Sequence, residues 1–86
     1  MLQVASSSQP ASVAGAIAGL IREDKLCELQ AIGAGAINQT IKAIAIARGY
    51  LAPSGIEIVS VPSFQDVAIR GEERTAMRFR VEKKSA

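Results

Sequence analysis

Hydrophobic and polar positions along the chain follow a strand period and then a helix period. Residues 2–6 alternate in polarity, which predicts a short first strand. Pro10, preceded by Ser8 and Gln9, is typical of the first position of a helix, which we expect to end near Asp24. The apolar residues of this helix repeat at the spacing of a single face, and they are Val13, Ile17, Leu20 and Ile21.

A second strand and helix follow in the same order. Residues 26–32 are apolar on both faces, which predicts an inner strand, and residues 33–35 turn directly into a helix over about residues 36–50. This helix has two apolar stripes, one of Ile37, Ile41 and Ile44 and another of Ala43, Ile46 and Ala47. Because a helix with two apolar sides is covered on both, we expect Ala43, Ile46 and Ala47 to form the interface of a homodimer or higher homo-oligomer.

The C-terminal third of the chain predicts two strands. A turn at residues 52–55 precedes a strand over residues 56–61, and we expect Pro62 to end or bulge it and to mark it as an edge strand. Residues 67–71 indicate one arm of a hairpin, and residues 74–82 alternate cleanly as the last strand. We expect the tail, residues 83–86, to be frayed.

The whole pattern indicates one α+β domain over residues 1–86, in the order β-α-β-α-β-β. Two helices on one face of a four-stranded sheet is the two-layer arrangement that buries both apolar surfaces. No apolar run approaches the roughly 18–20 residues that a membrane span needs, and no targeting segment is visible. We therefore expect a cytoplasmic protein with no membrane association.

Composition removes several kinds of chemistry. The chain has no His, no Trp and one Cys, which excludes His-based acid–base catalysis, a Cys/His zinc site and an internal disulfide. We expect no enzyme activity, no metal and no cofactor, and we expect Cys27 to be a small buried hydrophobic residue. Tyr50, Phe64 and Phe79 are too few to form a stacking platform for unpaired bases.

Charge leaves two interpretations open. Ten Lys and Arg residues against eight Asp and Glu residues give a net charge of +2. This mildly basic balance is compatible with a nucleic-acid partner, and ordinary solubility charge is the simpler explanation of it.

The starts of the two helices suggest an anion site. If the first two strands are parallel neighbours joined by a right-handed crossover, both helices begin at the same edge of the sheet. Backbone amides at Gly33 and Gly35, with Ser8 and Asn38, would then form a candidate anion-binding site, which Lys42 extends along the helix. The alternative is that the two glycines only permit a tight turn and close packing.

Arginines on the last strand suggest a second charged surface. Arg74, Arg78 and Arg80 point to the face opposite the strand's apolar residues, and roughly 7 Å between alternate residues approximates the spacing of phosphates. The alternative is a solvated strand face with cross-strand partners such as Glu57. At the hairpin tip, residues 70–74, the four charges cancel.

Longer segments form an ordered series of specific motifs. They are Val13-Ala14-Gly15-Ala16-Ile17-Ala18-Gly19, Gln30-Ala31-Ile32-Gly33-Ala34-Gly35-Ala36-Ile37-Asn38-Gln39, Lys42-Ala43, Ile46-Ala47-Arg48-Gly49, Ala52-Pro53-Ser54-Gly55 and Gly71-Glu72-Glu73-Arg74-Thr75-Ala76. Together they resemble the bacterial stage V sporulation protein S family over about residues 2–82. The resemblance implies an Alba-like fold with a mixed sheet ordered 1-2-4-3, a regulatory role in sporulation, and the dimeric DNA or RNA binding of Alba-like proteins.

The resemblance also implies where nucleic acid is held. Alba-like proteins use basic residues in the loop after the first strand and in the hairpin that joins the third and fourth strands. Here the loop, residues 6–9, has no Lys, and Glu72 and Glu73 lie beside Arg70 and Arg74.

The leading interpretation is a non-enzymatic nucleic-acid-binding regulator that acts as a dimer. Its phosphate contacts are expected at Ser7, Ser8, Lys42, Arg70, Arg74, Arg78 and Arg80. The alternative is a protein–protein or small-anion-binding module that keeps the fold without binding nucleic acid.

Overall fold

The computed structural model describes residues 1–85, in which four strands and two helices follow the order β-α-β-α-β-β. The elements are β1 (Leu2–Val4), α1 (Pro10–Arg22), β2 (Cys27–Ala31), α2 (Ala34–Leu51), a 3-10 turn η1 (Ala52–Ser54), β3 (Ile58–Ile69) and β4 (Glu72–Lys83). No helix within residues 1–85 has the length and hydropathy that crossing a bilayer requires.

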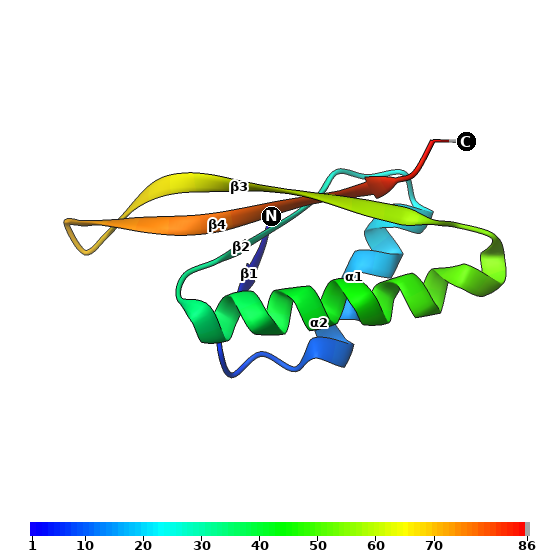
Figure 1. The fold of residues 1–86 in the computed structure, drawn as a ribbon, viewed down its shortest axis with the longest axis horizontal. Helices are drawn as coiled ribbons and strands as arrows, with labels where there is room; N and C mark the ends of the chain where they lie inside the picture. The colour runs from blue at the N-terminus through cyan, green and yellow to red at the C-terminus, as the bar shows by residue number, and fades with distance from the viewer. Residues whose placement is uncertain (86) are drawn as a thin grey trace.

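The four strands form one mixed sheet in the order β1-β2-β4-β3. β1 and β2 are parallel, and β4 is antiparallel to both of its neighbours. Both helices lie on the same side of this sheet, and the β3–β4 hairpin projects past the start of α2 (Figure 1). The predicted α+β class, the strand order and the edge position of β3 are therefore confirmed.

Small residues bring the helices close to each other and to the sheet. Ala14 and Ala18 of α1 and Ala36 of α2 are buried with larger side chains such as Ile17 and Leu29. Backbones can approach closely over alanine, so the core is aliphatic and thin. Phe79 is the one aromatic residue among the buried core residues of the described chain.

The core-facing side of α2 differs from the predicted one. Ala43 and Ala47 are fully buried in the core of the single chain, whereas Ile41 is 54% exposed. Because α2 packs over its alanines, its isoleucines move to the flanks of the contact. The prediction that Ala43 and Ala47 form a subunit interface is therefore wrong, and Ile46 is itself partly buried against the core.

Pro62 neither ends nor bulges its strand. β3 runs without interruption from Ile58 to Ile69, and Pro62 pairs with Phe79 in an unbroken register. The two-residue loop Arg70-Gly71 has φ of 52° and 79°, which is typical of a type I′ turn and makes Ile69 and Glu72 a hydrogen-bonded pair. Hydrogen-bonded and non-hydrogen-bonded pairs alternate along an antiparallel ladder, so Pro62, seven residues before Ile69, belongs to a non-hydrogen-bonded pair. Its nitrogen points away from β4, and the missing N–H of proline removes no hydrogen bond between the two strands.

The predicted frayed tail also begins too early. Lys83 is the last residue of β4 and pairs with Ile58, and the backbone N–H of Lys84 donates to the carbonyl of Glu57 at 2.9 Å. The ladder thus extends past the predicted end of the strand at residue 82. Ala86 lies outside the described residues.

Candidate functional site

The starts of the two helices lie together, as the parallel pairing of β1 with β2 requires. The side-chain amide of Gln39 on α2 donates to the carbonyl of Ser8 at 3.0 Å. The hydroxyl of Ser8 accepts the backbone N–H of Ala5 at 2.8 Å, which closes the loop after β1. Gly33 has φ of 88°, a conformation that favours glycine, and it ends the turn into α2.

At this end of the molecule the first backbone amides of both helices lack side-chain caps, and the loop after β1 is held by hydrogen bonds. Neither α1 nor α2 has a side-chain cap on its first-turn amides. The oxygen of Ser8 already accepts one bond, Ser7 is exposed, and Asn38 is exposed one turn into α2. The anion site at Ser8, Gly33, Gly35 and Asn38 stays a prediction.

The sheet separates Lys42 from the last-strand arginines. Lys42 is exposed on α2, which covers one face of the sheet (Figure 1). Arg78 and Arg80 alternate along β4 with the core residues Phe79 and Val81, so they point to the opposite, open face. On a single chain, a small ligand bound to Arg78 cannot also contact Lys42.

A polar row crosses the open face of the sheet. Gln3, Gln30, Arg78 and Ser63 stand opposite one another on β1, β2, β4 and β3. Nη2 of Arg78 donates to Oε1 of Gln30 at 2.7 Å, and Nε2 of Gln30 donates to Oε1 of Gln3 at 3.5 Å. Nε of Arg78 is buried and has no hydrogen-bond partner within residues 1–85.

Ion pairs gather away from the hairpin. Within residues 1–85 they are Arg48–Glu57 at 2.9 Å, Lys83–Asp24 at 2.6 Å, Lys25–Glu23 at 2.8 Å and Arg80–Glu82 at 3.8 Å. Glu57 thus pairs with α2 and not with the last-strand arginines. Four of the predicted contact residues have no ion pair in this part of the chain, namely Lys42, Arg70, Arg74 and Arg78.

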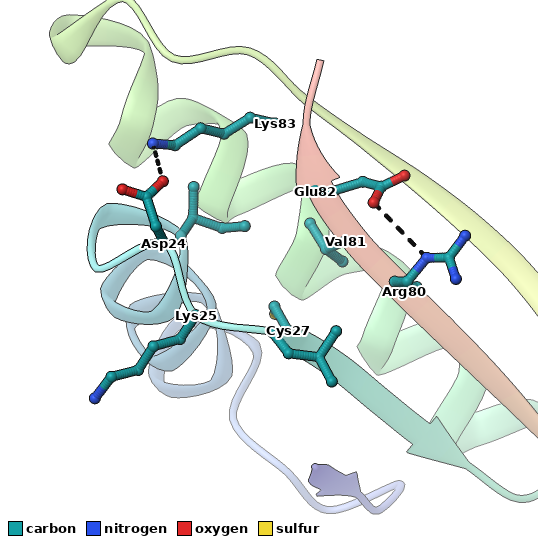
Figure 2. A pocket seen from close by; sticks show the side chains of 9 residues that line it. Asp24, Lys25, Cys27, Arg80, Val81, Glu82 and Lys83 are labelled. Carbon is teal, nitrogen blue, oxygen red and sulfur yellow. Dashed lines mark hydrogen bonds and ion pairs between the residues drawn. The ribbon is translucent and has the colours of Figure 1, made fainter. Parts of the chain in front are cut away.

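A pocket of about 370 Å³ lies at the end opposite the hairpin. Its walls include Ile21, Cys27 and Val81, and the pairs Lys83–Asp24 and Arg80–Glu82 border it (Figure 2). Burial raises the pKa of the Cys27 thiol, so this thiol is poorly suited to nucleophilic or metal chemistry. Among the described residues, no three His, Cys, Asp or Glu side chains are grouped to hold a metal ion.

A second pocket, also of about 370 Å³, separates α2 from the edge strand and is termed the α2–β3 groove. Its lining residues are Ile41, Ile44, Ala45 and Arg48 of α2, Ile58, Ser60 and Pro62 of β3, and Phe79 of β4. Ser60 Oγ is buried there and has no hydrogen-bond partner in the part of the chain that the structure describes. On the same face of β3, Phe64 is 73% exposed.

Comparison with known protein families shows to which family this chain belongs. The family model for stage V sporulation protein S (SpoVS) matches residues 1–84. The chain belongs to the stage V sporulation protein S family. The match covers every helix and strand, so the polar row, the hairpin and the α2–β3 groove all lie within the SpoVS family region.

Two features of this SpoVS family member were missed by sequence reasoning. One is Gln30, which had no role until the strand register placed it beside Arg78; its polar character within an apolar inner strand was the available signal. The other is the exposed side of α2 at Ile41 and Ala45. No signal in the spacing alone separates it from the core side, because both sides are apolar.

Proposed function

We propose that the protein is a non-enzymatic, nucleic-acid-binding regulator that acts in the cytoplasm as a homodimer and holds the phosphate backbone of DNA or RNA. The observation that carries this proposal is the distribution of free positive charge. Arg70, Arg74 and Arg78 on the hairpin and open face have no ion pair in the described chain, whereas Lys25, Arg48 and Lys83, away from the hairpin, are each paired with a carboxylate. Unpaired guanidinium groups are the usual ligands of phosphate oxygens.

Binding of this kind reads little of the base sequence. The described open face has no aromatic side chain, because Phe79 lies in the core and Phe64 is on the helix side of β3. Affinity then comes from backbone charge, and it falls steeply as salt rises.

The α2–β3 groove supports the homodimer. Ile41 and Ile44 form its helix wall, and Ile58 and Pro62 form its strand wall. Under a two-fold axis that runs along the groove, the helix wall of one copy would face the strand wall of the other, which would make the surface self-complementary. A second copy would remove the exposed isoleucine from water and stabilise a small domain whose own core is thin.

The test is binding of labelled DNA and RNA, each single- and double-stranded and about 30 nucleotides long, followed by fluorescence anisotropy. At micromolar protein and about 50 mM salt we expect saturable binding, with affinity falling at least tenfold by about 200 mM salt. No binding of any of the four probes at the lower salt overturns the proposed function.

A second candidate is a protein-binding or small-anion-binding module. The acidic hairpin residues Glu72 and Glu73 and the uncharged loop at residues 6–9 favour it. Titration with inorganic phosphate would then shift the amide resonances of Gly33 and Gly35, whether or not nucleic acid binds.

A further inference from the structure

Arg78 has an unusual environment for a half-buried cation. Its cross-strand neighbours, Gln30 and Ser63, are both neutral. Its hydrogen bond within the described residues goes to the Gln30 amide oxygen at 2.7 Å, and its Nε is buried without an acceptor. A guanidinium has five N–H donors, so most of its hydrogen-bonding capacity has no acceptor in this part of the chain.

Arg80, two residues further along the same face, provides the contrast. It stands opposite Glu28 on β2 and its Nε lies 3.8 Å from a carboxylate oxygen of Glu82. The positive charge of Arg80 is therefore balanced by its neighbours, and that of Arg78 is not. Charges that are removed from water are normally paired, because an uncompensated buried charge is costly.

Gln30 is fixed in the orientation that holds Arg78. It is only 8% exposed on the inner strand β2. Because a guanidinium only donates, the oxygen of the Gln30 amide must face Arg78, and its NH₂ group then faces Oε1 of Gln3. Gln3 and Gln30 thus position the guanidinium of Arg78 and leave its positive charge uncompensated.

We propose that Arg78 is the residue that anchors a backbone phosphate, that Gln30 is its positioning residue, and that bound nucleic acid crosses the open face of the sheet at this point. This inference rests on the proposed function and names the part of the surface that carries it. Arg74 lies on the same face of β4, four residues and about 13 Å away. It therefore contacts a second phosphate of the same nucleic-acid strand. A phosphodiester backbone has a charge on every nucleotide and can satisfy both arginines.

The test compares Arg78→Gln with its matched control Arg22→Gln in the full chain, by anisotropy with the probe that binds wild type best. We expect Arg78→Gln to lower affinity about tenfold or more and to reduce the salt slope by about one, as loss of one phosphate contact requires. We expect Arg22→Gln to stay within about twofold of wild type, because Arg22 ends α1 on the helix side of the sheet and its guanidinium donates to the carbonyl of Tyr50 at 3.2 Å.

Gln30→Glu tests the positioning role without removing the arginine. The new carboxylate pairs with Arg78 inside the sheet, so the expected loss of affinity matches that of Arg78→Gln while the far-ultraviolet circular dichroism spectrum is unchanged. Wild-type affinity in Gln30→Glu overturns the role of Gln30.

A direct measurement covers the case in which Arg78→Gln does not fold. In wild type, the Nε–Hε resonance of Arg78 is expected to shift on addition of the oligonucleotide, and its absence of response overturns the anchor. Equal affinity of the two arginine variants overturns the anchor and leaves the proposed function standing, whereas no binding by wild type overturns both. An equal shift of this resonance with poly-glutamate at the same salt overturns the nucleic-acid ligand in favour of an acidic protein.

Discussion

A Cβ atom on Gly35 would lie 3.0 Å from the Cβ atom of Ser6, so the start of α2 is in van der Waals contact with the loop after β1. A separation this short leaves no room for a methyl group unless the loop moves. The bond from Gln39 to the carbonyl of Ser8 fixes the same loop from the next turn of α2. Gly35 therefore permits close packing against this loop, whereas the positive φ of the turn into α2 belongs to Gly33.

Gly35→Ala tests that contact, with Gly15→Ala as its control. Gly15 lies within α1 and a Cβ there has open space, so Gly15→Ala should raise the free energy of unfolding by about 0.5–1 kcal/mol. The free energy of unfolding of Gly35→Ala should lie about 1 kcal/mol or more below that of Gly15→Ala, because overpacking against the loop offsets the gain. Urea denaturation measures both variants, and equal stabilisation by the two would contradict the contact.

The pair Arg48–Glu57 predicts a pH dependence of stability. The side-chain hydrogen bond and the positive charge of Arg48 lower the pKa of Glu57 below its usual range. Because the carboxylate is favoured in the folded state, its contribution is present above the unfolded pKa of about 4.3 and is lost as pH falls through the lower folded pKa. Wild type should therefore melt above Glu57→Gln at pH 7, and the two melting temperatures should converge near pH 2–3. A difference that persists unchanged at pH 2 is incompatible with this pair.

Much of the fold follows from periodicity, and α2 shows where periodicity stops. The strand order agrees with the resemblance, and the edge position of β3 was predicted from Pro62. The two stripes of α2 are both apolar, and the stripe of smaller residues faces inward because Ala43 and Ala47 permit the closest approach to the core. Residue type alone ranks Ile41 as the better core residue, so the sequence pattern favours the wrong side.

The candidate site was predictable in its parts and not in its arrangement. Alternation along the last strand correctly puts Arg78 and Arg80 on one face. Their different environments depend on the register, which sets Gln30 opposite one and Glu28 opposite the other. A one-residue change of register would exchange the faces of every side chain, and no local signal fixes it to that accuracy.

Cys27 should behave as a core residue. It is 1% exposed, and burial raises the pKa of its thiol, so both access and thiolate fraction are low in the folded state. At pH 8 the native protein should react with a thiol-specific disulfide reagent at least about a hundredfold more slowly than the protein in concentrated urea, since reaction needs opening of the core. Comparable rates in the two solvents would show that the thiol is accessible from the adjacent pocket.

Ile41→Asp tests the homodimer through the α2–β3 groove. Ile41 lines that groove and is 54% exposed in the single chain, so a carboxylate there is tolerated by the monomer and excluded from an apolar interface. Leu26→Asp is the matched control, because Leu26 is 71% exposed and lies outside the groove. Sedimentation velocity should give a monomer for Ile41→Asp and the wild-type dimer for Leu26→Asp. If Ile41→Asp keeps the wild-type mass, subunits do not meet at this groove; if wild type is itself a monomer, the homodimer is wrong.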